Sequence, residues 1–139
     1  MAKYRFFPHT ADTKFRGYGK TMEEAFGNAA LALTRVMTEK EIAKNFEKEI
    51  SAEGTDEKAL LYNFLEQFIV LFDTEDFLLS EIKEIEIKKN DKFTLKAKVI
   101  GDNDIKKYDI LKTIKAVTYS EMEIKQDKAG FMVQVVLDI

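Results

Sequence analysis

The chain contains no cysteine, and its 139 residues include one histidine, one proline and six glycines. The absence of cysteine excludes disulfides, thiol catalysis and zinc sites built on thiolates. A single histidine cannot supply a zinc site that needs several imidazoles, and no cysteine can complete one with it. So little proline and glycine leaves no stretch typical of a flexible linker. We therefore expect a single domain that spans residues 1–139.

Charge and apolar content narrow the class of protein further. Apolar residues make up 45% of the chain, and the eleven phenylalanines can fill a core without cross-links. The 22 basic residues are interleaved with 25 acidic ones, so no stable direct binding of nucleic acid is expected. Asn63, Glu66 and Gln67 interrupt the most apolar helix, and the N-terminus has no apolar signal core. These features predict a cytoplasmic protein with no membrane partner.

Residue periodicity predicts two helices and seven strands. Thr21 and Glu24 form a capping box, and apolar residues three and four apart continue that helix to residue 37. A second amphipathic helix begins after Thr55 or Asp56 and ends near Asp73. Period-two patterns and turn signals predict strands at residues 4–7, 13–18, 45–53, 79–89, 92–100, 113–125 and 131–138.

Tight turns at residues 90–91 and 127–130 make the strands that they join antiparallel. The predicted fold class is α+β, with two layers: a mostly antiparallel sheet and two amphipathic helices on one of its faces. If the last turn pairs Asp127 with Gly130, Asp138 lies opposite Tyr119. Lys115 and Glu121 then share its face of the sheet.

Two short motifs resemble phosphate and calcium loops but are incomplete. The Gly-Lys-Thr run at residues 19–21 has Lys14 where a P-loop requires glycine, so it is typical of a turn and a helix cap. The Asp-Asn-Asp run at residues 102–104 has Lys106 at the third ligand position, as in a solvated loop. Taken alone, His9 is typical of a hydrogen-bonded structural residue, and Asp138 of a charge at a chain end.

Five blocks in order carry a more specific signal. They are His9-Thr10-Ala11-Asp12, GKTMEEAFGNAALAL at 19–33, LFDTEDFL at 71–78, IKAVTYS at 114–120 and the terminal VVLDI at 135–139. With these blocks the chain resembles the archease family from end to end. It departs from the family at residues 101–113, where a longer acidic loop and a histidine are often found. Here that stretch is short and contains Tyr108, so we assign it no role.

The resemblance implies a function that composition does not indicate. Archease assists the RNA ligase RtcB, which seals tRNA halves using GTP and manganese. It promotes guanylylation of the ligase, allows multiple turnover and widens nucleotide use, without being an enzyme itself. Two alternatives stay open. One is a chaperone or modulator of other RNA-processing enzymes, such as a tRNA methyltransferase. The other is a metal-dependent phosphoryl-transfer enzyme, which the sequence disfavours because no base is paired with a nucleophile.

The resemblance also implies a metal site, with calcium as the expected divalent ion. The family's ligands match Asp12, Asp138 and Ile139 in this chain, and oxygen ligands suit calcium. Pro8 fits the end of a strand, because it cannot donate a hydrogen bond within a sheet. We expect His9 and Thr10 to hold the turn that presents Asp12. Lys115 is either an ordinary exposed lysine or a partner for a carboxylate or phosphate.

Overall fold

The structure, a computed structural model, describes residues 2–9 and 12–139. Within these ranges it has two α-helices, seven β-strands and a short 3-10 helix, η1. The helices are α1 (Met22–Met37) and α2 (Glu57–Glu75), and η1 is Ile105–Lys107. The strands are β1 (Tyr4–Phe7), β2 (Thr13–Gly19), β3 (Phe46–Gly54), β4 (Leu78–Lys89), β5 (Phe93–Asp102), β6 (Ala116–Asp127) and β7 (Gly130–Asp138).

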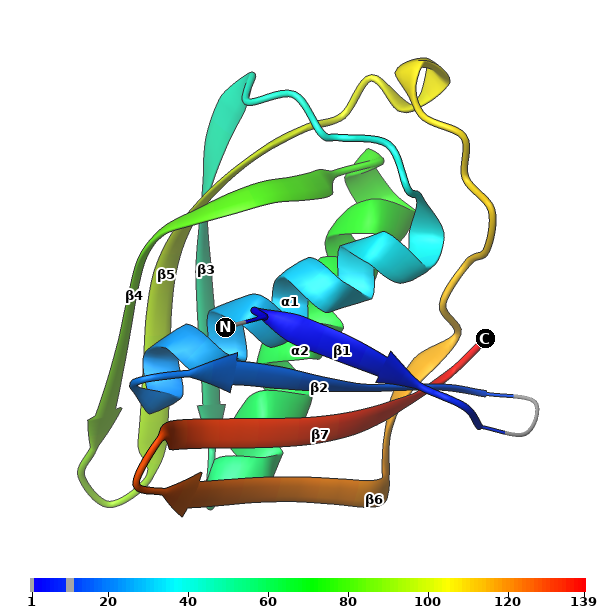
Figure 1. Cartoon of the computed structure of the whole chain (residues 1–139). Helices are drawn as coiled ribbons and strands as arrows, with labels where there is room; N and C mark the ends of the chain where they lie inside the picture. The colour runs from blue at the N-terminus through cyan, green and yellow to red at the C-terminus, as the bar shows by residue number, and fades with distance from the viewer. Residues whose placement is uncertain (1, 10–11) are drawn as a thin grey trace.

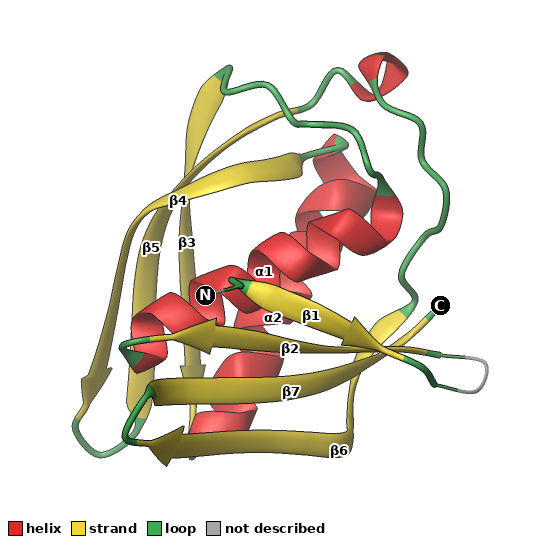
Figure 2. Cartoon of the chain, in the orientation of Figure 1, coloured by secondary structure: helices red, strands yellow, loops and turns green. Residues whose placement is uncertain are grey.

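The strands form two sheets, and every pairing within them is antiparallel. One sheet has the order β1-β2-β7-β6 and the other has the order β3-β5-β4 (Figure 2). The predicted α+β class, the two helices and the antiparallel pairing are confirmed. The expectation of one continuous sheet with both helices on a single face is corrected, because each helix packs against strands of both sheets.

The composition of α1 explains why two sheets are needed. A helix on one sheet buries a single stripe, whereas α1 buries residues on most of its circumference. Its buried residues include Ala25, Ala30, Ala32 and Thr34, which do not lie on one stripe. β2 and β7 cover it from one sheet and β4 from the other. Gly17 on β2 permits the close approach, because a Cβ there would lie 2.8 Å from the Ala25 carbonyl oxygen.

Both predicted helix starts are confirmed by their caps. The Thr21 hydroxyl accepts a hydrogen bond from the Glu24 backbone N–H at 3.1 Å. The Asp56 carboxylate accepts one from the Ala59 backbone N–H at 2.7 Å. Each cap satisfies a donor that has no partner inside its helix.

The segment between β5 and β6 connects the two sheets, as Figure 1 shows. At its start the Asp102 carboxylate, 2% exposed, accepts a hydrogen bond from the Tyr108 hydroxyl at 2.6 Å. Farther along, the Leu111 backbone N–H donates to the Met37 carbonyl at the end of α1 at 2.7 Å. The chain therefore crosses an end of the molecule here, and β5 and β6 are not neighbours.

The pairing of β6 with β7 contains a large irregularity. Ala116 pairs with Asp138 and Thr118 with Val136, but the next pair is Glu123 with Gln134. Residues 119–122 of β6 thus lie opposite Val135 alone. The expectation that Asp138 faces Tyr119 is wrong, because these extra residues shift the register and bring Ala116 opposite Asp138.

Candidate functional site

The register of β2 and β7 brings the two predicted aspartates to the same end of one sheet. Thr13 pairs with Leu137 at the end of this ladder. Asp12 directly precedes Thr13 and Asp138 directly follows Leu137, so one further step of the ladder places the two aspartates side by side. Residues paired in this way project from the same face, with Cβ atoms about 4.5–5.5 Å apart. Figure 1 shows the C-terminus at this end of β1 and β2.

Exposure makes both carboxylates accessible. The Asp12 side chain is 35% exposed, and Asp138 is also exposed. Asp138 is held by the backbone, because Ala116 pairs with it and its carbonyl accepts a hydrogen bond from the Lys115 N–H at 2.8 Å. Ile139, the third expected ligand, follows directly. The three predicted ligand positions therefore gather at one end of the sheet.

His9 lies beside Asp12 in the structure. Its Nδ1 atom is 3.9 Å from an Asp12 carboxylate oxygen, and its ring is 21% exposed. On the other side of the ring, Nε2 donates a hydrogen bond to the Glu121 carboxylate at 2.7 Å. His9 therefore connects Asp12 with β6. Thr10, the other residue expected to hold this turn, lies outside the described residues.

Glu121 is the residue of this cluster to which the sequence gave no role. One carboxylate oxygen accepts from His9, and the other accepts from the Lys14 ammonium at 3.2 Å. The hydrogen bond from His9, and after it that from Lys14, lowers the pKa of the Glu121 carboxyl below its usual value. The backbone carbonyl of Glu121 also accepts a hydrogen bond from the Gln134 side-chain amide at 2.7 Å. Because Glu121 lies within the β6 irregularity, the period-two pattern that placed it on the Asp138 face does not indicate these contacts.

Lys115 was expected either to be an ordinary exposed lysine or to pair with a carboxylate or phosphate, and no such carboxylate partner is found among the described residues. Its side chain is exposed, and no salt bridge involves it among the described residues. Its contact with Asp138 is the backbone hydrogen bond. Ala116, rather than Lys115, holds the position opposite Asp138. Since successive side chains of a strand point to opposite faces, Lys115 does not share the Asp138 face of the sheet, and that expectation is wrong.

The available donors can be compared with what calcium requires. Carboxylate oxygens suit a hard cation, and both aspartates are open to solvent. Among residues 2–9 and 12–139, no group of three or more histidine, aspartate or glutamate side chains is placed to hold a metal ion. Asp12 and Asp138, with Ile139 beside them, therefore fit a cation only when waters complete its shell, as in a weak site.

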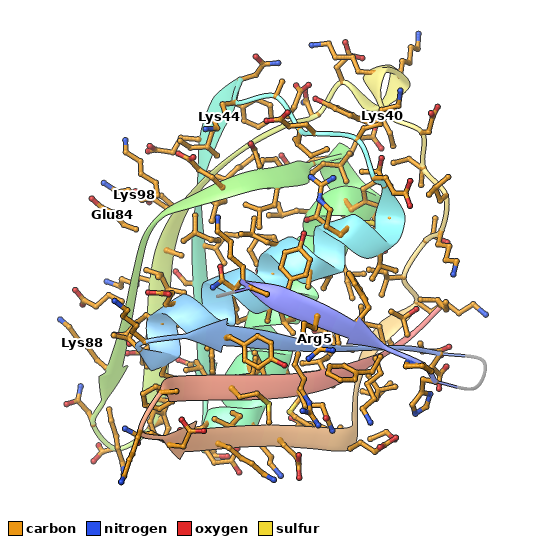
Figure 3. The ribbon with its side chains drawn as sticks, in the orientation of Figure 1. Arg5, Lys40, Lys44, Glu84, Lys88 and Lys98 are labelled. Atoms are coloured by element: carbon orange, nitrogen blue, oxygen red, sulfur yellow. The ribbon has the colours of Figure 1, made fainter. Side chains whose placement is uncertain are left out.

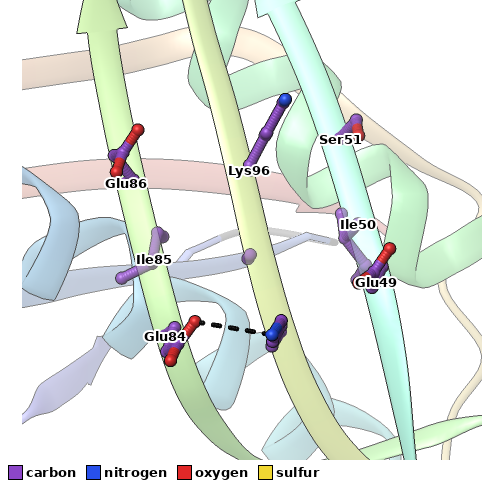
Figure 4. Close-up of a pocket in the computed structure, with 9 residues that line it drawn as sticks. Glu49, Ile50, Ser51, Glu84, Ile85, Glu86 and Lys96 are labelled. Atoms are coloured by element: carbon purple, nitrogen blue, oxygen red, sulfur yellow. Dashed lines mark ion pairs between the residues drawn. The ribbon is translucent and has the colours of Figure 1, made fainter.

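The molecule also has hollows that lie away from the two aspartates. Figure 4 shows one of about 660 Å³ on the outer face of β3, β5 and β4. Its charged side chains come from neighbouring strands, and Glu84 and Lys98 form an ion pair at 3.9 Å. Figure 3 shows these two side chains pointing away from the core, on the other side of the molecule from the C-terminus. Cross-strand pairs of this kind are typical of a solvated sheet surface.

Comparison with known families agrees with the sequence blocks and with this geometry. Residues 4–139 match the model of the Archease protein family. The chain belongs to the archease family. Its archease relatives include one from Pyrococcus abyssi, 38% identical over the full length of both chains. Another, from Methanosarcina barkeri, is 36% identical and covers 99% of this chain and 96% of its own.

Solved structures show the same archease fold. The solution structure of a Methanobacterium thermoautotrophicum protein matches all of both chains, with a TM-score of 0.87 and 33% identity. A Thermotoga maritima crystal structure, described as an archease and possible chaperone, has a TM-score of 0.63 at 20% identity. It covers 96% of this chain and 94% of its own. The resemblance inferred from the five sequence blocks is thereby confirmed.

Proposed function

We propose that this chain is a non-enzymatic activator of an RtcB-type, GTP-dependent tRNA-splicing RNA ligase. It promotes guanylylation of the ligase, allows multiple turnover and broadens nucleotide use in the cytoplasm. The observation that carries the proposal is the register of β2 and β7, which gathers Asp12 and Asp138 at one exposed end. The link to the ligase comes from what the resemblance to archease implies.

The arrangement of charges suits contact with a nucleotide-binding active centre. Asp12, Asp138 and Ile139 would hold calcium or a related divalent cation, with waters as the remaining ligands. A cation bound there would neutralise phosphate charge and orient the nucleotide. Lys115, whose backbone bonds Asp138 and whose side chain has no ion pair among the described residues, is available at this end of the sheet for a phosphate or a ligase carboxylate. These residues bind and orient, and none of them changes covalently.

The remaining parts of the proposal concern partners. The ligase is the proposed protein partner, and no stable direct contact with nucleic acid is required. No helix in the described part of the chain is long and apolar enough to cross a membrane. The rival function is that of a chaperone or modulator of other RNA-processing enzymes, such as a tRNA methyltransferase. It is favoured by the description of the Thermotoga maritima relative as a possible chaperone.

A turnover assay separates the two functions. Folded, purified ligase is mixed with excess RNA ends, GTP and manganese, and ligated product is counted per ligase molecule. An activator should raise this number well above one, because it restores the guanylylated ligase after each cycle. A chaperone should instead raise the yield of active ligase during refolding and leave the folded ligase unchanged. No increase in turnover of the folded ligase would contradict the proposed function.

A further inference from the structure

Glu121 has a backbone conformation that its residue type does not favour. Its φ is +52°, in the left-handed region that glycine adopts readily and side chains with a Cβ do not. Among the described non-glycine residues, only Asp76 shares a positive φ, and Asp76 ends α2 as its C-cap. A left-handed residue is common at a helix end. Glu121 lies inside β6, so it requires another explanation.

The conformation places a carboxylate over the neighbouring strands. Residues 119–122 take up extra length opposite Val135, and within them the Glu121 carbonyl accepts the amide of Gln134. The Glu121 carboxylate then accepts hydrogen bonds from the His9 ring at 2.7 Å and from the Lys14 ammonium at 3.2 Å. His9 precedes β2, and Lys14 lies within it. Glu121 of β6 thus contacts β7, β2 and the segment that follows β1.

Stability alone does not explain why a glutamate occupies this strained position. Its side chain is 48% exposed, and ion pairs in such positions contribute little to folding. Glycine would adopt the same backbone without strain. A strained residue that persists is a sign of function, provided that its side chain has a use. The Glu121 side chain bonds one edge of the His9 ring, and the opposite edge of that ring faces Asp12 at 3.9 Å. Orienting this ring is the function that the contacts indicate for the carboxylate.

We propose that Glu121 is a positioning residue: it fixes the His9 ring and, through that ring, holds Asp12 beside Asp138 for a divalent cation. The inference rests on the proposed metal role of the two aspartates. Among the described residues, Nδ1 of His9 is buried and has no hydrogen-bond partner, so the bond to Glu121 is the one that orients the ring. Residues that orient the ligands of a metal site typically change its affinity about 10- to 100-fold when they are replaced.

The test measures calcium affinity by titration calorimetry and the melting temperature without metal. Glu121→Gly should bind calcium about tenfold or more weakly, while its melting temperature stays equal or rises because the strain is relieved. Glu121→Gln keeps an oxygen acceptor for His9 and should fall between the wild type and Glu121→Gly. Glu123→Gln is the matched control, since Glu123 lies on the same strand and pairs with Lys125 instead. It should bind as the wild type does.

Each outcome distinguishes the role of Glu121 from the metal site itself. Wild-type affinity in both Glu121 variants would overturn the positioning role and leave the metal site standing. A wild type that binds no calcium would overturn the metal site and this inference with it. A large fall in the melting temperature of Glu121→Gly would overturn the argument that the glutamate serves a function at this position, because it would show a structural role.

Discussion

Replacing Phe64 by alanine is expected to lower the free energy of unfolding by about 3–5 kcal/mol. Phe64 is fully buried on α2, and its ring stacks on Phe26 of α1 with centroids 6.3 Å apart. It also meets the Phe68 ring edge-on at 5.2 Å. Alanine would leave a cavity between the two helices at the centre of the core, where neighbouring rings have little room to collapse.

Urea denaturation measures the effect, and Val70→Ala on the same helix is the matched control. Val70 is 46% exposed, so its truncation leaves no cavity and should change stability by less than about 0.5 kcal/mol. A loss below about 1 kcal/mol for Phe64→Ala would contradict the packing of α2 between the two sheets.

Replacing Asp102 by alanine is expected to cost on the order of 3 kcal/mol. The buried carboxylate accepts hydrogen bonds from the Tyr108 hydroxyl at 2.6 Å and from the Asn45 side-chain amide at 2.9 Å. The backbone N–H of Asn103 donates to it at 2.9 Å. Removing the acceptor leaves buried donors without partners, and each unsatisfied donor is destabilising. The connection between β5 and β6 should loosen first.

The same carboxylate should make stability depend on acidity. The hydrogen bond from Tyr108, followed by that from Asn45, lowers the pKa of Asp102 from 3.8 to about 2 against the opposing effect of burial. The folded protein therefore binds this proton less readily than the unfolded chain. Its stabilising contribution is complete above about pH 4 and is lost as the pH falls towards 2.

Melting temperatures between pH 5 and pH 2 check this dependence against Asp102→Asn. The wild type should lose stability more steeply with acid than Asp102→Asn, because the amide does not titrate. Equal slopes for the two proteins would contradict a depressed pKa for Asp102.

The secondary structure could be predicted from local signals. The caps at Thr21 and Asp56 locate the helix starts, and the turn at residues 127–130 locates the last hairpin. The division into two sheets could not be predicted from periodicity. A period-two pattern marks which residues are buried, but it does not say which helix or sheet covers them. The alanine-rich α1, buried on most sides, is the feature that could have indicated it.

In the candidate site, only the residues at the ends of strands could be predicted from the sequence. Asp12 and Asp138 were named from the family blocks, and the register of β2 with β7 brings their positions together. The role of Glu121 depends on a register shift of β6 and a left-handed backbone at a residue that is not glycine. Neither has a sequence pattern, because tertiary contacts with His9, Lys14 and Gln134 stabilise them.

The central claim is that Asp12 and Asp138 activate the ligase, and formation of the ligase–guanylate adduct tests it most directly. Folded ligase, manganese and labelled GTP are mixed with the wild type, with the Asp12→Ala/Asp138→Ala double variant or with Glu84→Ala. Glu84 is the control because it lies on the outer face of β4, away from the two aspartates (Figure 3). Glu84→Ala should stimulate adduct formation as the wild type does, and the double variant should leave it at the level of the ligase alone. Full stimulation by the double variant would contradict the account.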